Sequence, residues 1–193
     1  MRPGLGMVLL GLAAALFGSG QDVAAVLLID DFSSEAGSAL GTKWQTFTDQ
    51  VMGGASAGTA SYETLGGRRC LRLRGQVSLE NQGGFIQAAL PLVRQGGAFD
   101  AGAYQGIRLW VRGNGAEYYV HLRTEDTRLP WQYYEAAFET GPDWTRVDIP
   151  FSAFTAENLA AALATGKLKR LAVVAAKKAF AADVAVARIE FYK

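Results

Sequence analysis

The stretch from residue 107 to residue 124 reads IRLWVRGNGAEYYVHLRT and decides the fold class. Apolar and polar side chains alternate on both sides of Gly113-Asn114-Gly115, which is a strong turn signal. Alternation with a period of two is typical of β-strands that bury one face. We therefore predict strands over Ile107–Arg112 and Tyr118–Thr124.

The same pattern recurs along most of the chain in short runs bounded by Gly, Asn, Asp or Pro. Further strands are predicted over Val26–Phe32, Trp44–Phe47, Gly58–Tyr62, Arg69–Arg74, Phe85–Leu90, Trp131–Phe138, Thr145–Ile149, Leu168–Ala176 and Val184–Phe191. Only Thr155–Thr165 is predicted to be helical, with Thr155 as N-cap and Gly166 as the C-terminal stop. Since this spacing leaves no room for repeated crossover helices, we predict an all-β fold: an antiparallel jelly-roll β-sandwich with one short helix.

Composition excludes several function classes. The 193 residues include 19 Lys and Arg against 18 Asp and Glu, so the near-neutral charge gives no case for nucleic-acid binding. Cys70 and His121 are the only residues of their types, which excludes a disulfide within the chain, a cysteine metal cluster and a site with several histidine ligands. We predict no metal and no cofactor.

The beginning of the chain resembles an export signal. Arg2 precedes an apolar run from Leu5 to Phe17, which is the length of a secretory core and too short to span a bilayer. We predict a signal peptide over residues 1–25, a single domain over residues 26–193, and a periplasmic or secreted bacterial protein. An uncleaved membrane anchor is the alternative; otherwise membrane contact is expected only through the signal or a partner.

Strand phase predicts an outward face opposite the apolar set. If the strands of 107–112, 118–124 and 131–138 are neighbours, aromatic and charged side chains collect on one surface. The predicted binding residues are Arg108, Trp110, Arg112, Tyr119, His121, Arg123, Trp131, Tyr133 and Glu135. The alternative is an ordinary solvated sheet face on which loops cover some of the aromatic rings.

Two Gly-rich segments form a second group of candidate residues. Each contains a double glycine, which permits a tight turn or a close backbone approach, and a polar residue able to accept backbone N–H bonds. Neither is a phosphate loop, because no Lys-Ser/Thr pair follows the glycines. We interpret both as structural loops first. Their candidate residues are Asp49, Met52, Gly53, Gly54, Ser56, Glu80, Asn81, Gly83 and Gly84.

Four ordered motifs give the chain a family resemblance. They are Asp49-Gln-Val-Met-Gly-Gly-x-Ser56, Glu80-Asn-x-Gly-Gly-Phe85, Tyr104-x-Gly-Ile107 with Val111-Arg-Gly-Asn-Gly115, and Trp144-x-x-Val-x-Ile-Pro-Phe-x-x-Phe154. Together they resemble the complex I intermediate-associated protein family, across roughly residues 30–192. The resemblance implies a galactose-binding-like jelly roll related to some carbohydrate-binding modules. It also implies assembly of NADH:ubiquinone oxidoreductase, since the mitochondrial members are assembly chaperones rather than enzymes.

Two functions remain open at this point, and neither is enzymatic. The first is a protein-binding or assembly-factor module of the cell envelope. The second is a carbohydrate-binding module that stacks a glycan on the aromatic face. A concave, open trough would favour a glycan, and a flat apolar patch would favour a protein. Hydrolysis would need two suitably spaced carboxylates, and no spacing singles out a pair among Glu80, Glu125, Asp126 and Glu135.

Overall fold

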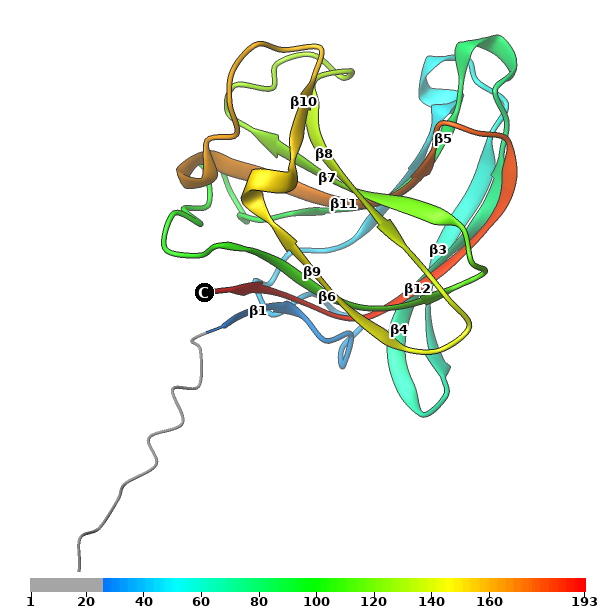
Figure 1. Ribbon diagram of the computed structural model, residues 1–193, viewed down its shortest axis with the longest axis horizontal. Coiled ribbons are helices and arrows are strands. Elements are labelled where there is room, and N and C mark those ends of the chain that lie inside the picture. Colours follow the sequence, from blue (N-terminus) through cyan, green and yellow to red (C-terminus); the bar gives the residue numbers. More distant parts are fainter. Residues whose placement is uncertain (1–25) are drawn as a thin grey trace, which may run out of the picture.

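A computed structural model describes residues 26–193 as two antiparallel β-sheets that pack face to face (Figure 1). The predicted signal peptide, residues 1–25, lies outside the described residues. Among the residues described, no helix has the length and apolar character needed to cross a membrane.

The sheets contain twelve strands within residues 26–193. Sheet A has the spatial order β3 (Ala57–Leu65), β4 (Arg68–Val77), β12 (Phe180–Tyr192), β6 (Gly106–Gly113) and β9 (Thr145–Pro150), with β1 (Leu27–Asp30) also paired to β12. Sheet B has the order β10 (Thr155–Glu157), β8 (Tyr133–Glu139), β7 (Glu117–Thr124), β11 (Leu168–Ala176), β5 (Phe85–Pro91) and β2 (Gln45–Thr48). Many neighbours are distant in sequence, as in a jelly roll, so the predicted fold class is confirmed.

In the described part of the chain, four short 3₁₀ helices connect the strands: η1 (Asp49–Met52), η2 (Glu80–Gln82), η3 (Phe151–Ala153) and η4 (Thr165–Lys167). The two that lie in the Gly-rich segments are η1 and η2. Both flank strands of sheet B, since η1 follows β2 and η2 precedes β5.

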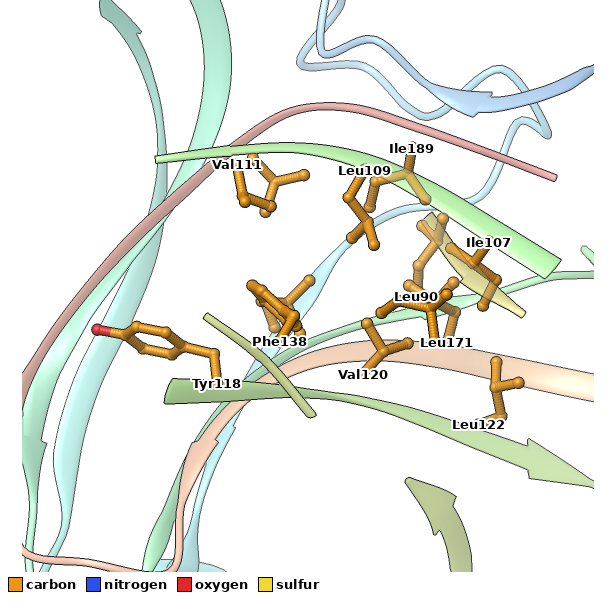
Figure 2. Close-up of a cluster of buried hydrophobic side chains, with 14 of the residues drawn as sticks. Leu90, Ile107, Leu109, Val111, Tyr118, Val120, Leu122, Phe138, Leu171 and Ile189 are labelled. Atoms are coloured by element: carbon orange, nitrogen blue, oxygen red, sulfur yellow. The ribbon is translucent and has the colours of Figure 1, made fainter. Parts of the chain in front are cut away.

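The core lies between the sheets and consists of the side chains that strand phase predicts. The inward residues of β6, β7 and β8 are all buried: Ile107, Leu109, Val111, Tyr118, Val120, Leu122, Tyr134, Ala136 and Phe138. Figure 2 shows the β6 side chains pointing toward those of β7. Burying one large aliphatic side chain stabilises the fold by about 1.5–3 kcal/mol, so this phase is strongly specified.

The prediction that β6 and β7 are neighbours is wrong. The Gly113-Asn114-Gly115 turn does not close a hairpin; it carries the chain from sheet A to sheet B. Gly113 is required at this crossing, because a Cβ there would lie 2.9 Å from the Asp183 carbonyl oxygen and closer still to Thr140. Arg108, Trp110 and Arg112 therefore lie on the outer face of sheet A, on the side of the sandwich away from β7 and β8.

The predicted helix over 155–165 is also wrong. Its first residues form β10, which pairs with the edge of β8, and Asn158 has a left-handed φ of 58° that a helix does not allow. Leu159 and Leu163 pack against the main core from irregular backbone. Edge pairing and core contacts thus outweigh the helix propensity of this Ala-rich run, because propensity alone is worth only tenths of a kcal/mol per residue.

Candidate functional site

The two Gly-rich segments meet at the carboxylate of Asp49, which is buried at the start of η1. Its Oδ1 accepts a hydrogen bond from the Ser56 backbone N–H at 2.9 Å, and its Oδ2 accepts one from the Ser56 hydroxyl. The same Oδ2 also accepts the backbone N–H groups of Gly84 at 2.5 Å and Phe85 at 3.3 Å. One side chain therefore closes the first loop and ties it to the second.

Each double glycine contains one close-approach position and one left-handed position. A Cβ on Gly54 would lie 2.3 Å from Asp49 Cγ, and one on Gly83 would lie 2.4 Å from Asp49 Oδ2. Gly53 and Gly84 adopt φ values of 87° and 139°, which side chains rarely permit. The structure thus gives the glycines of both motifs a backbone role. Asn81, in contrast, accepts no backbone N–H from any described residue and instead adopts a left-handed φ of 56°.

The hydrogen bonds keep Asp49 charged. Burial alone would raise the pKa of its carboxyl, but the bonds from Ser56, Gly84 and Phe85 outweigh burial and lower the pKa below its usual value of 3.8. The carboxylate is therefore ionised at neutral pH and acts as a fixed structural acceptor.

A cavity of about 300 Å³ lies over the outer face of sheet B. In Figure 1 this face is the upper side of the molecule, with the loops of η1 and η2 at the right and the β7–β8 connection at the left. The cavity joins the two groups of predicted residues. Those that line it are Met52, Gly83 and Gly84 from the motif loops and His121, Arg123 and Tyr133 from the predicted face.

The floor of the cavity is apolar and comes from strands that sequence reasoning did not assign to the site. Ala172, Val174 and Ala176 project from β11, beside Phe85 of β5. With Ala89 and Tyr119 they form a second, smaller apolar cluster outside the main core. The alternation in 168–176 could have indicated these residues, but nothing local shows that β11 lies between β7 and β5.

A polar cluster occupies one wall. The imidazole of His121 stacks on the Tyr133 ring, with 4.1 Å between centroids and 10° between planes. Its Nε2 lies 3.4 Å from Glu135 Oε2, and Glu135 Oε1 accepts from the Lys177 ammonium. That ammonium also lies 4.8 Å from the centroid of the Tyr119 ring. Tyr119 and Glu135 have the predicted phase but are buried beneath Lys177, so neither offers a free surface.

Charge in this cluster is balanced internally. Burial would raise the pKa of the Glu135 carboxyl, but the adjacent His121 imidazole and Lys177 ammonium lower it overall. Burial lowers the pKa of His121 in spite of Glu135. Burial also raises the pKa of Tyr133 to about 12, so its phenol remains protonated. The wall thus presents a flat aromatic stack rather than an exposed carboxylate.

Arg123 holds the β7–β8 connection in place. Its guanidinium donates to the backbone carbonyls of Leu129 at 2.7 Å and of Thr127 and Pro130 at 3.3 Å. This residue lines the cavity with part of its side chain, but its hydrogen bonds position the loop that carries Trp131. Trp131 itself precedes β8, is half-exposed, and does not line the cavity.

Exposed apolar side chains gather on the loops at both sides of the cavity. They are Val51, Met52 and Leu79 on the η1 and η2 side and Leu129 and Trp131 on the β7–β8 side, with 43% to 70% of each residue exposed. In residues 26–193 the one other exposed large hydrophobic side chain is Val26. Exposed apolar groups gathered in this way mark interaction surfaces more often than solvated ones.

The outer face of sheet A has a different character. Arg108 forms a two-point ion pair with Asp148, at 2.7 and 2.8 Å, and Arg188 pairs with Glu190. These charges are paired with one another within the sheet. Trp110 and Arg112 share that face and take no part in the cavity described above.

The remaining motif residues surround the cavity without lining it. Ser56 is buried behind the loops, whereas Gly53, Glu80 and Asn81 are exposed on them. In the part of the chain that the structure describes, no three or more His, Cys, Asp or Glu side chains are grouped so as to hold a metal ion.

Comparison with known families gives a direct result. The model for Complex I intermediate-associated protein 30 (CIA30) matches residues 31–178, well over half of the chain. The chain belongs to the CIA30 family. The predicted family is thereby confirmed, and the Asp49 linkage explains two of its motifs physically. No curated protein matches the sequence.

Solved structures show the fold that this CIA30 domain shares. The family 11 carbohydrate-binding module of a cellulase of Clostridium thermocellum superposes with a TM-score of 0.69 and 11% identity, covering 88% of this chain and 95% of that one. The same module in complex with a β-1,3-1,4-mixed-linked tetrasaccharide gives 0.67 and 13%, covering 86% and 95%. A family 30 carbohydrate-binding module gives 0.62 and 15%, covering 87% of each chain. At these identities the likeness shows the fold alone.

Proposed function

We propose that this CIA30 domain is a non-catalytic binding module that docks an apolar segment of a protein partner in the cavity on the outer face of sheet B. The observation that carries the proposal is the apolar floor of Ala172, Val174 and Ala176 between two loops that expose large hydrophobic side chains. Covering such groups with a partner's apolar residues releases about 25 cal/mol per Å².

The cavity alone does not separate the two candidate ligands, because its shape is concave, as in a glycan site, while its floor is apolar, as in a protein-binding site. The loops of η1 and η2 favour a protein ligand. Met52 and Leu79 are flexible aliphatic side chains, which bury well against a peptide and offer no ring on which a sugar can stack. Membership of a family named for association with an assembly intermediate also supports a protein ligand.

A glycan is the second candidate, and the stack of His121 on Tyr133 favours it. A flat pair of rings at the cavity wall can receive a sugar face, with Gln87 and Lys177 close enough in the same lining to orient hydroxyl groups. The fold likeness to carbohydrate-binding modules is compatible with this candidate.

Catalysis is left out of the proposal because the lining of the cavity includes no carboxylate side chain. Glu135 lies behind it and is engaged by His121 and Lys177. A glycoside hydrolase needs an acid and a second carboxylate on opposite sides of its substrate.

We also propose that the domain works in the cell envelope, because the run from Leu5 to Phe17 resembles the apolar core of a secretory signal. The N-terminal sequence of the protein recovered from outside the cytoplasm should begin near Val26. Recovery of the full-length chain from the cytoplasm would overturn this placement.

Site-specific photo-crosslinking tests the proposed function. A benzophenone side chain introduced at Met52 and, separately, at Leu129 should give adducts with the same protein in cells that naturally make this chain. The matched control is Arg146 on the outer face of sheet A, whose side chain is also more than half exposed. Adducts from Arg146 alone, or from none of the three positions, would contradict the proposal. Binding on a glycan array that Tyr133→Ala abolishes, with no protein adduct, would establish the second candidate instead.

A further inference from the structure

Two arginines that form no ion pair within residues 26–193 lie on neighbouring strands at one end of the cavity. In the antiparallel pairing of β7 with β11, Arg123 lies directly opposite Arg170. Like charges at opposed positions of a sheet repel each other and destabilise it.

A β-bulge brings a third cation to the same place. The β7–β11 register shifts between Leu168 and Arg170, so Lys169 has no partner on β7. Bulges commonly redirect a side chain next to a functional site. Here both Lys169 and Arg170 line a second cavity of about 430 Å³, which adjoins the first and shares Arg123 and Arg170 with it.

The positive charge of this second cavity is not neutralised within residues 26–193. None of the ion pairs there includes Arg123, Lys169 or Arg170. The acidic residues nearest in sequence, Glu125 and Asp126, are exposed on the following turn and make no such pair.

The guanidinium groups of Arg123 and Arg170 differ in how many of their N–H groups already form hydrogen bonds. That of Arg123 is bonded to the carbonyls of the β7–β8 connection and is therefore held in position. That of Arg170 lies 5.5 Å from the centroid of the Phe47 ring and donates to no acceptor among the described residues. A guanidinium with free N–H groups that lines the same cavity as two further cationic side chains suits a group whose oxygen atoms share a negative charge.

We propose that Arg123, Lys169 and Arg170 form a binding site for an oxyanion, meaning a phosphate, sulfate or carboxylate group. Thr124 and Thr127 add small polar side chains to its lining, and Gly96 and Gly97 line it without side chains. The site lies next to the apolar cavity, so one ligand could fill both, with its apolar part on the β11 floor and its acidic group here. The oxyanion site itself holds for a protein or a glycan ligand.

Thermal unfolding of the full chain in sodium phosphate, sodium sulfate or sodium acetate, each compared with sodium chloride at equal ionic strength, tests the site. At ten times the dissociation constant the bound oxyanion should raise the Tm by about 3–6 °C above the chloride value. Phosphate and sulfate also stabilise proteins without binding, so the response that counts is the part that Arg170→Gln removes. A larger response of this kind to phosphate than to acetate assigns a tetrahedral oxyanion, and the reverse assigns a carboxylate. No difference between any of these anions and chloride would overturn the proposal.

Variants that remove one positive charge test whether the oxyanion binds at these residues. Arg170→Gln and Lys169→Gln should each raise the dissociation constant about tenfold or more, because a charge-assisted hydrogen bond is lost. The matched control is Lys167→Gln, which removes an exposed charge two residues away and outside the cavity lining, and should leave the constant within about twofold.

A second readout separates binding from folding. In chloride alone, Arg170→Gln should unfold at the same or a higher temperature than the natural chain, since the repulsion from Arg123 is gone. An Arg170→Gln chain with a native circular dichroism spectrum that still binds phosphate as tightly as the natural chain would refute the site.

Discussion

Replacing Asp49 by Asn changes the one side chain that joins the two motif loops. The amide can keep one oxygen toward the Ser56 N–H, at the 2.9 Å position of Oδ1. Its NH₂ group then replaces Oδ2 and faces the N–H groups of Gly84 and Phe85, so donors face donors.

The cost follows from those two backbone groups. Each of these part-buried N–H groups costs about 1–3 kcal/mol when left without an acceptor, and the charge that strengthened both bonds is lost as well. We expect Asp49→Asn to lower the free energy of unfolding by about 3–5 kcal/mol and the Tm by roughly 6–20 °C. Asp31→Asn is the matched control: Asp31 accepts a single exposed N–H bond, from Ser33, and its replacement should cost under about 1 kcal/mol.

Chemical denaturation at several pH values measures this prediction. Because the folded-state pKa of Asp49 lies below its usual value of 3.8, the unfolded chain binds a proton more readily. The contribution of Asp49 is therefore complete above that value and is lost as the pH falls through the lower folded-state pKa. The stability difference between the natural chain and Asp49→Asn should shrink over the same range.

A double-mutant cycle checks the geometry. Gly83→Ala places a Cβ 2.4 Å from Asp49 Oδ2, so it should be strongly destabilising in the natural chain and much less so in an Asp49→Ala background. Equal costs in both backgrounds, or an Asp49→Asn chain as stable as Asp31→Asn, would refute the reasoning that the two loops depend on this carboxylate.

Two further predictions concern backbone strain and the buried ion cluster. Gly53→Val should lower the free energy of unfolding by about 1–3 kcal/mol through backbone strain at a φ of 87°. A clash does not contribute, since no described atom lies within 4 Å of the added Cβ. An unchanged denaturation midpoint would mean that the backbone relaxes freely there. Lys177→Met should cost about 1–3 kcal/mol at pH 7, reduced by the partial exposure of the ammonium, because Glu135 keeps only His121 as a partner. The folded-state pKa of Glu135 lies below the usual 4.5, so the loss of stability in Lys177→Met should fade as the pH drops below that value. A loss of stability that does not depend on pH would contradict the ion pair between Lys177 and Glu135.

The sequence predicts the faces of the strands well because the signal is local. The alternation in 107–111, 118–122 and 134–138 places every inward side chain of these segments in the core, whichever strands are neighbours. Strand order is not local. The turn at Gly113-Asn114-Gly115 indicates a change of direction, and only packing decides that it crosses between sheets.

The difference between local strand phase and non-local strand order also explains which site residues the sequence predicts. Period-two phase finds His121 and Tyr133, and the glycine motifs find the loops, but their meeting depends on a hydrogen bond between Asp49 and Gly84, 35 residues later. The contribution of β11 depends on its position between β7 and β5. Trp110 joins the predicted surface only under the assumption that β6 neighbours β7, and that assumption is wrong.

The affinity of the cross-linked partner for two aromatic variants tests the central claim most directly. Tyr133→Ala removes a ring from the cavity wall on sheet B, and Trp110→Ala removes a larger ring from the outer face of sheet A. With both variants folded by circular dichroism, calorimetry should show the dissociation constant rising about tenfold or more for Tyr133→Ala and unchanged for Trp110→Ala. Weakening by Trp110→Ala with Tyr133→Ala unaffected would place the binding surface on sheet A and contradict the account.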